Sequence, residues 1–239
     1  MSLVVDQLSK SYGAQLAVDA ISFHLKQGEV VGFLGPNGAG KSTTLKMIAG
    51  FLAPDQGKIE INGIPMHQDA IVAKKMIGYL PESNALYEHL YVKEYLEFLT
   101  TVHGLQNAYQ RITHVIEQTG LGLMQHKKIG SLSKGYKQRL GIAAAIIHQP
   151  KLVLLDEPTT GLDPNQLIEI RALIQTLSKD ALILFSTHIL QEVTAICDRV
   201  LVLHQGKLVA DEPIGALLGK TQYKFRRNIQ IAYPLKKRV

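Results

Sequence analysis

The order of apolar and polar residues predicts a chain that alternates between short strands and helices. Apolar or alternating stretches bounded by turn residues predict strands at 3–5, 20–25, 29–34, 58–63 and 75–80. The stretch EVVGFL at 29–34 is almost continuously apolar, which is typical of a parallel strand buried on both faces. A helix follows it and is expected to end at Gly50, a residue suited to a helix C-terminus.

The pattern becomes helical after residue 83. Apolar residues recur on one face of 91–104 and of 107–120, and each stretch closes with a glycine. Asn107 is expected to be the N-cap of the second helix. A third helix is expected to run from Ser133 to the residues before Pro150.

Strands and helices then alternate again. Strand patterns return at 151–158 and 181–188, and the helix between them begins at Pro164 with Asp163 as its N-cap. Such a series implies a parallel sheet flanked by helices. The sequence therefore predicts a core with a β subdomain at 1–83 and 151–219, a helical subdomain at 84–150 and a basic tail at 220–239.

The composition is that of a soluble globular protein, with 46% hydrophobic and 19% charged residues among 239. The apolar runs are too short to cross a bilayer, and the first residues lack the apolar core of a signal peptide. The single cysteine, Cys197, excludes an internal disulfide and fits a reducing compartment. Its apolar neighbours indicate a packing role.

The net charge of +6 is concentrated at the C-terminus, where 220–239 holds seven basic residues and no acidic one. The rest of the chain is almost neutral, so the charge gives poor support to a nucleic-acid interface. Two interpretations of the tail stay open. It is either a polybasic segment that lies on an anionic membrane surface or a solvated chain end.

The residues GPNGAGKST match the phosphate-binding pattern G-x-x-x-x-G-K-[ST] and lie between a buried strand and a helix. Glycines let consecutive backbone N–H groups point at a phosphate, and the helix N-terminus adds positive potential. Lys41 is expected to reach the terminal phosphates of ATP, and Ser42 to ligate Mg²⁺. The predicted nucleotide-binding residues are Gly35, Pro36, Asn37, Gly38, Ala39, Gly40, Lys41, Ser42 and Thr43.

Two later strands end in residues that suit hydrolysis of a bound nucleotide. Asp156 ends the apolar run LVLL and is expected in the Mg²⁺ shell. Glu157 follows it and is expected to orient or deprotonate the attacking water. His188 ends ALILFSTH, where an imidazole could contact the γ-phosphate and the water, and a structural role at a strand end is its alternative.

This order of motifs resembles the ATP-binding subunit of ABC transporters over about residues 1–219. The phosphate loop is followed by a helical insertion and then by LSKGYKQR, LVLLDEP, TGLD and STH at matching spacing. The runs IGYLPESNALYEHLYVKEYLEF and SLSKGYKQRLGIAAAIIHQPKLVLLDEPTTGLDPNQ look closest to the ABC-2 exporter branch, particularly to its gliding-motility type. The resemblance implies an α/β P-loop NTPase fold with a mainly parallel sheet flanked by helices, an N-terminal antiparallel β subdomain and an inserted helical subdomain.

The resemblance also gives a role to the small, basic stretch SLSKGYKQRL. Ser133 and Gly135 match the family's signature motif, which completes the ATP site of a second ATPase chain packed head to tail. A homodimer is expected here. The family usually has glycine at the position of Lys134 and glutamine at that of Tyr136, and Lys134 either adds a cation near the phosphate or lies in solvent.

Three further residues match functional positions of the family. Tyr12 corresponds to the aromatic residue that stacks on adenine, and simple packing is its alternative. Glu82 stands where the family usually has glutamine, and it either faces Mg²⁺ or water or is a surface residue. Asp163 lies in the loop that couples the two sites of the dimer, and its N-cap role is a competing or additional explanation.

The resemblance therefore implies a transport ATPase with ATP and Mg²⁺ as its cofactors. It would bind and hydrolyse MgATP and drive a separate membrane permease, with export as the expected direction, at the cytoplasmic face of the membrane. Residues 83–100 are expected to form part of the groove that receives the permease. The alternatives are a soluble ABC-type ATPase that acts on nucleic acid or the ribosome, and a nucleotide-binding regulator without turnover.

The sequence argues against both alternatives. Soluble ABC-type ATPases typically have tandem cassettes, long coiled coils or cysteine-rich modules, whereas this chain has one phosphate loop, no long heptad run and one cysteine. A regulator without turnover would need neither Glu157 nor His188. Nucleic acid is therefore not an expected partner.

Overall fold

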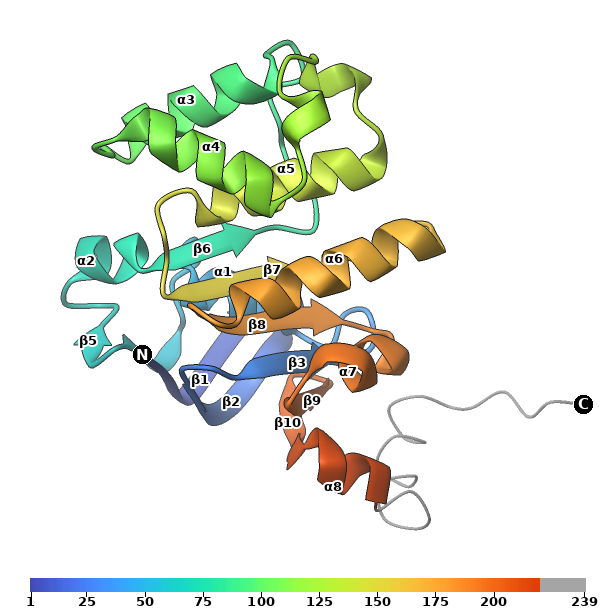
Figure 1. Cartoon of the computed structure of the whole chain (residues 1–239). Helices are drawn as coiled ribbons and strands as arrows, with labels where there is room; N and C mark the ends of the chain where they lie inside the picture. Colours follow the sequence, from blue (N-terminus) through green and yellow to red (C-terminus); the bar gives the residue numbers. More distant parts are fainter. Residues whose placement is uncertain (220–239) are drawn as a thin grey trace, which may run out of the picture.

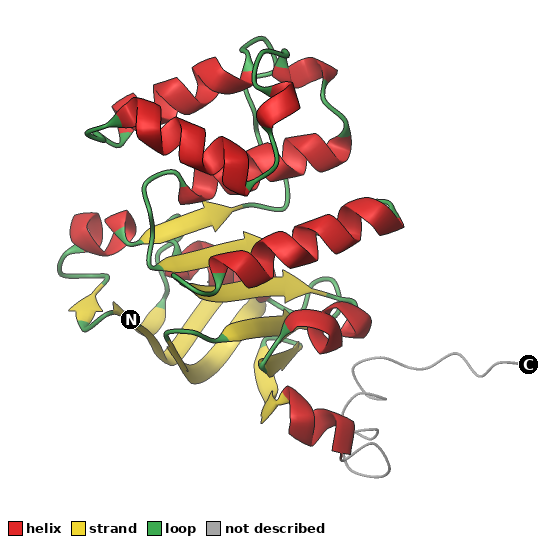
Figure 2. Ribbon diagram, in the orientation of Figure 1, coloured by secondary structure: helices red, strands yellow, loops and turns green. Residues whose placement is uncertain are grey.

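The computed structural model describes residues 1–219 and contains two β-sheets, with helices packed around the larger one (Figures 1 and 2). The strands are β1 Ser2–Tyr12, β2 Gln15–Lys26, β3 Val30–Leu34, β4 Gln56–Ile61, β5 Ile64–Pro65, β6 Ile77–Leu80, β7 Leu152–Asp156, β8 Leu182–Thr187, β9 Arg199–His204 and β10 Lys207–Pro213. The helices are α1 Lys41–Ile48, α2 Ala70–Lys75, α3 Val92–Val102, α4 Ala108–Gln118, α5 Lys134–Ile146, α6 Pro164–Leu177, α7 Leu190–Ile196 and α8 Ile214–Gly219. None of these helices has the length and apolar character that crossing a bilayer requires.

The larger sheet has the strand order β10-β9-β3-β8-β7-β6. Strands β9, β3, β8, β7 and β6 pair in parallel. Among residues 1–219, only β10 joins this sheet antiparallel. The smaller sheet, β2-β1-β4-β5, is antiparallel throughout. The predicted fold class is therefore confirmed: a mainly parallel sheet, an antiparallel N-terminal sheet and a helical insertion.

The larger sheet is buried on both faces, which explains the continuous apolar runs of its strands. All residues of β3 and β7 are buried. In β7, Leu152 and Leu154 pack with α1 and the smaller sheet, whereas Val153 and Leu155 pack with α6, α7 and the helical insertion. The sheet therefore lies between two hydrophobic cores, and α1 lies between the two sheets (Figure 1).

The helical block, formed by α3, α4 and α5, lies beyond the β6 edge of the larger sheet (Figure 1). It meets the sheet through a close approach of α5 to β6. A Cβ atom at Gly78 would overlap the carbonyl oxygen of Ala145. Arg111 of α4 fixes the end of α5, because it donates hydrogen bonds to the carbonyl oxygens of Ile146 (3.0 Å) and Ile147 (2.7 Å).

Several expected details hold, and others do not. Gly50, Gly104 and Gly120 follow helices with positive φ values of 70°, 62° and 67°, as a left-handed helix end requires. Cys197 is buried and unpaired, and burial raises the pKa of its thiol, in agreement with a packing role. Asn107 is the N-cap of α4, as expected, although with a φ of 59° its side chain makes no capping hydrogen bond.

The expected strands and helices did not include α2, α7, α8, β5, β9 and β10, and β1 is longer than the expected 3–5. The basic tail at 220–239 lies outside the described residues.

The contact between Gly78 and α5 generates a prediction about stability. We expect Gly78→Ala to lower the free energy of unfolding by about 1–3 kcal/mol, because the added methyl group meets backbone and forces α5 away from β6. Gly122→Ala is the matched control, since a Cβ there meets nothing within 4 Å and should change stability by less than about 0.5 kcal/mol. Urea unfolding measures both, and equal effects would contradict this account of the α5–β6 contact.

Candidate nucleotide-binding site

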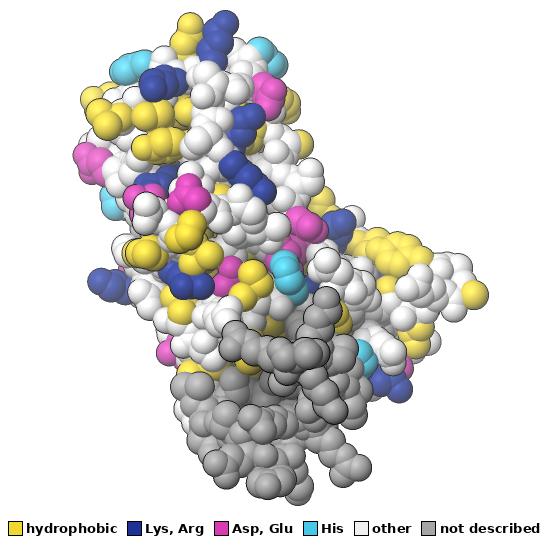
Figure 3. Space-filling model, turned by 90° about the vertical axis from the view of Figure 1, so that its right-hand side faces the viewer, with side chains coloured by type: hydrophobic (Ala, Val, Ile, Leu, Met, Phe, Trp, Pro, Cys, Tyr) yellow, Lys and Arg dark blue, Asp and Glu magenta, His cyan; other side chains and the backbone are white. Residues whose placement is uncertain are grey.

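The tips of three neighbouring strands bring the predicted site residues to one edge of the larger sheet. β3, β8 and β7 are adjacent and parallel, so Leu34 is level with Thr187, and Asp156 with Ser186. The carboxyl ends of parallel strands are where ligands bind in open α/β sheets. Figure 3 looks onto this edge, where acidic and histidine side chains gather at mid-height of the molecule.

The phosphate loop connects β3 to α1 and encloses the Lys41 side chain. Gly38 and Gly40 have φ values of 79° and 105°, which let the loop turn back over the start of α1. The Lys41 ammonium is 5% exposed and donates hydrogen bonds to the carbonyl oxygens of Gly35 (2.8 Å) and Pro36 (3.3 Å). The loop therefore holds a buried cation at the N-terminus of a helix, which is an arrangement that attracts phosphate.

Asp156 is joined to α1 and to β8 by hydroxyl groups. Ser42 at the start of α1 and Ser186 in β8 both donate hydrogen bonds to Asp156 Oδ1, at 3.0 and 2.6 Å. Ser186 Oγ also accepts a hydrogen bond from the backbone N–H of Glu157 at 2.9 Å. Ser186 therefore orients both acidic residues at the tip of β7.

The carboxylate of Glu157 is the point where the other predicted residues converge. Its Oε2 atom lies 2.9 Å from His188 Nδ1 and accepts a hydrogen bond from Thr160 at 2.9 Å. Its Oε1 atom accepts no hydrogen bond and lies 3.4 Å from the Lys41 ammonium. Glu157 has a φ of 51°, an unusual backbone conformation for a non-glycine residue that is often found at functional sites.

A cavity of about 470 Å³ opens beside this cluster. Its wall includes the phosphate loop, Glu157, Glu82 and, at the far side, the half-exposed ring of Tyr12. A Cβ at Gly38 would meet nothing within 4 Å, so the loop leaves room on its cavity side. The cavity thus joins a phosphate cradle, a carboxylate and an aromatic ring, which are the parts that binding of ATP requires.

The oxygen atoms of Asp156 and of its neighbour Ser42 are suitable ligands for a Mg²⁺ ion that binds together with a nucleotide. The described residues contain no group of three or more His, Cys, Asp or Glu side chains that could hold a metal by themselves. Mg²⁺ is usually held by one or two carboxylates together with phosphate and water oxygens. Asp156 and Ser42 offer such a pair of oxygens. Burial and the charges of Asp156 and Glu82 raise the pKa of Tyr79, so both carboxylates lie near this ring.

The signature residues and the TGLD loop do not line this cavity. Ser133 is the N-cap of α5 and accepts a hydrogen bond from the Tyr136 N–H at 3.4 Å, whereas Gly135 is buried. Asp163 is the N-cap of α6, accepting from the N–H groups of residues 165 and 166 at 3.0 and 2.9 Å, so its expected capping role is confirmed. Lys134 is exposed in the single chain, and its side chain lies beside Gly161 of the TGLD loop.

Two residues of the site were absent from the sequence prediction. Ser186 is an ordinary serine inside a buried strand, and its role depends on the pairing of β7 with β8. Thr160 contacts Glu157 through the turn that follows β7. The sequence did contain a signal for Ser186: it is a serine near the end of a predicted strand, and the preceding predicted strand has acidic residues near its end.

Known proteins are similar to this chain in sequence. The family described as "ABC transporter" matches residues 18–160. The bacitracin transport ATP-binding protein BcrA of Bacillus licheniformis is 41% identical over 212 residues, which are 88% of this chain and 69% of that protein. The Nod factor export ATP-binding protein I of Paraburkholderia xenovorans is 38% identical over 217 residues, 89% of this chain and 71% of that one.

A solved structure is similar as well. The cbiO1 protein of Clostridium perfringens, described as part of the ABC transporter complex cbiONQ, has a TM-score of 0.84 and 28% sequence identity. The match covers 97% of this chain and 95% of that chain.

The double role of Ser186 generates a prediction. We expect Ser186→Ala to lower the free energy of unfolding by about 1–3 kcal/mol, because the buried N–H of Glu157 loses its acceptor. We also expect weaker ATP hydrolysis, since Glu157 is then less firmly held. Ser131→Ala removes an exposed hydroxyl that bonds to Lys128 and is the control, with both properties nearly unchanged. Urea unfolding and phosphate release measure the two effects, and a Ser186 variant that matches the control would refute the role of Ser186.

Proposed function

The chain belongs to the ABC transporter family as one of its ATP-binding, ATP-hydrolysing subunits, and we propose that it works as a head-to-tail homodimer that drives a separate membrane permease. One observation carries the ATP turnover in this proposal: a buried lysine of the phosphate loop faces a buried glutamate 3.4 Å away, beside a cavity of about 470 Å³. A binding protein without turnover needs the lysine but has no use for the glutamate.

In the proposed reaction, Lys41 and the backbone of the phosphate loop bind the phosphates of ATP, and Asp156 and Ser42 hold its Mg²⁺. Glu157 orients the attacking water and accepts its proton, and His188 steadies the Glu157 carboxylate. Tyr12 stacks on adenine, and Glu82 faces Mg²⁺ or water. Mg²⁺ supplies positive charge that stabilises the leaving phosphate oxygens.

The position of the signature residues supports the dimer. Ser133 lies at the exposed N-terminus of α5 and does not line the cavity of its own chain. An anion at this helix terminus must therefore come from another molecule, and a second chain with ATP on its own phosphate loop supplies one. We propose Ser133, Gly135 and Asp163 as the contacts that complete the partner's site.

Exposed aromatic and apolar side chains on the helical block support a docking groove for a permease. Tyr87, Phe98 and Val102 are 49%, 45% and 63% exposed, and hydrophobic side chains are visible on this part of the molecule in Figure 3. Tyr87 packs against Tyr95 and Phe98 with ring centroids 5.9 and 5.8 Å apart. The division into a core at 1–83 and 151–219 and a helical subdomain at 84–150 would let this groove move with the signature helix.

The name of one relative, the Nod factor export ATP-binding protein I, supports export as the direction of transport. We place the chain at the cytoplasmic face of the membrane as part of the same proposal. Within the ABC-2 exporter branch, the runs at 77–98 and 131–166 support the finer proposal of a gliding-motility type. The chain itself would then be peripheral, held at the membrane by its permease.

The role of Glu157 gives the first test. We expect Glu157→Gln to retain ATP binding and to lower hydrolysis by about two orders of magnitude or more, because the amide keeps the shape but loses the charge that polarises water. ATP should then hold the dimer together. Phosphate release and size-exclusion chromatography with MgATP measure this, and near-normal turnover would remove Glu157 from the proposed role.

Complementation between two defective chains tests the head-to-tail arrangement. Lys41→Ala removes the phosphate-binding cation, and Gly135→Asp puts a negative charge where a γ-phosphate must approach. A dimer of either variant alone would have two damaged sites, so neither variant should dimerise with ATP. In the mixed dimer, one site collects both defects and the other is intact.

We therefore expect mixing to restore ATP-dependent dimerisation, measured by size exclusion with Glu157→Gln in both chains. A mixture that remains as defective as either variant alone would show that SLSKGYKQRL does not act on a second copy of this chain.

A further inference from the structure

The helical block is anchored to the core at one end of α5. Near its C-terminus, α5 packs against β6 at Gly78, and His148 Nε2 lies 2.9 Å from the carbonyl oxygen of Ile77. Ser133 is at the other end. A helix with the 13 residues of α5 is about 20 Å long, so a tilt of roughly 10° about this anchor would move Ser133 by about 3 Å. Presentation of Ser133 to a partner therefore requires a second contact near the N-terminus of α5.

That second contact is provided by α6. Arg139 of α5 forms an ion pair with Glu169 of α6, and its other guanidinium nitrogen donates to the carbonyl oxygen of Thr119 at 3.1 Å. One turn closer to the N-terminus, a Cβ at Gly135 would lie 2.6 Å from the side chain of Gln166. Arg139 thus connects the end of α4, the signature helix and α6.

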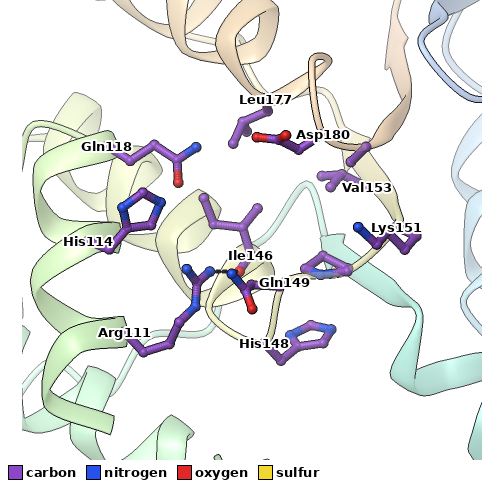
Figure 4. Close-up of a pocket in the computed structure, with 12 residues that line it drawn as sticks. Arg111, His114, Gln118, Ile146, His148, Gln149, Lys151, Val153, Leu177 and Asp180 are labelled. Carbon is purple, nitrogen blue, oxygen red and sulfur yellow. Dashed lines mark hydrogen bonds between the residues drawn. The ribbon is translucent and has the colours of Figure 1, made fainter. Parts of the chain in front are cut away.

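The opposite end of α6 is separated from the helical block by a cavity of about 450 Å³ (Figure 4). Arg111, His114 and Gln118 of α4 line one side, and Leu177 and Asp180 line the other. No hydrogen bond or ion pair described for these residues crosses the cavity. Apolar packing against α6 is non-directional, whereas a charge-assisted hydrogen bond fixes an angle. The Arg139–Glu169 pair is therefore a directional contact between α5 and α6.

Helix α6 begins at the end of the loop that follows Glu157. Thr160 donates to Glu157 Oε2 at 2.9 Å, and Asp163 caps α6 three residues later. A continuous series of contacts thus runs from the carboxylate of one site, through α6, to the helix that would serve the partner's site.

We propose that the Arg139–Glu169 ion pair is a positioning contact that holds the signature helix to α6 so that Ser133 reaches the partner's nucleotide. This inference rests on the proposed head-to-tail dimer. Neither Arg139 nor Glu169 lines the cavity beside the phosphate loop, and their side chains are 18% and 55% exposed. They act by fixing where Ser133 lies.

The test is a double-mutant cycle in chains that all carry Glu157→Gln. Light scattering measures the MgATP concentration that gives half-maximal dimerisation. This concentration is compared among the parent, Glu169→Arg, Arg139→Glu and the exchanged pair that carries both changes. A dimer contains two such pairs, so we expect each single reversal to raise this concentration about tenfold or more. The exchanged pair should recover a clear part of the loss seen in Arg139→Glu, because the ion pair is restored while the hydrogen bond to Thr119 is not, and this non-additivity would not arise if each residue acted alone.

Asp180→Arg is the matched control, because it reverses a carboxylate at the other end of α6 and should leave dimerisation unchanged. Binding of the fluorescent analogue mant-ATP to the monomer should stay within about twofold in every variant. Glu169→Gln, at the more exposed partner, should give about a threefold shift and keeps the test valid if Arg139→Glu does not fold.

Unchanged dimerisation in Glu169→Arg and Glu169→Gln, or simple additivity in the exchanged pair, would overturn the role of the ion pair while leaving the dimer intact. A parent that does not dimerise with MgATP would instead overturn the head-to-tail unit, and this inference with it.

Discussion

The burial of the Glu157 carboxylate at the tip of β7 is the constraint on which the rest of the site depends. Its side chain is 6% exposed, and a buried charge is stable only when opposite charge and hydrogen-bond donors surround it. Lys41, His188 and Thr160 supply these from three separate segments: the phosphate loop, the tip of β8 and the turn before α6. A change in charge near this carboxylate therefore alters the interactions of all three segments at once.

Lys41 is the member of this cluster for which a nucleotide would compete. Its ammonium donates to two neutral carbonyl oxygens and faces Glu157, and a phosphate oxygen is a stronger acceptor than a carbonyl. Once Lys41 turns to phosphate, Glu157 keeps His188 and Thr160 as its partners. In the proposed function this leaves the carboxylate free to act on water only when ATP is bound.

The sequence predicted which residues gather at one edge of the sheet better than it predicted the elements around them. Asp156 and His188 could be placed together because the carboxyl ends of parallel strands share an edge, whatever the exact strand order. Short elements such as α2 and β10 were missed, because six or seven residues carry too little periodicity to separate from a loop. Ser186 was missed because its two hydrogen bonds exist only after β7 and β8 pair.

The two helix N-termini that could bind phosphate differ in what their own chain provides. The start of α1 has Asp156, Glu157 and a cavity beside it. The start of α5 has the exposed Ser133 and Lys134, and none of the hydrogen bonds and ion pairs among residues 1–219 joins either to an acidic residue. In the proposed function, the first helix terminus binds the nucleotide of its own chain, and the second contacts a nucleotide that the partner already holds. Within one chain, α6 connects the turn that contacts Glu157 to the start of α5. In the proposed homodimer, the position of Ser133 at the partner's nucleotide would therefore depend on the state of the chain's own site, and the two sites would be coupled.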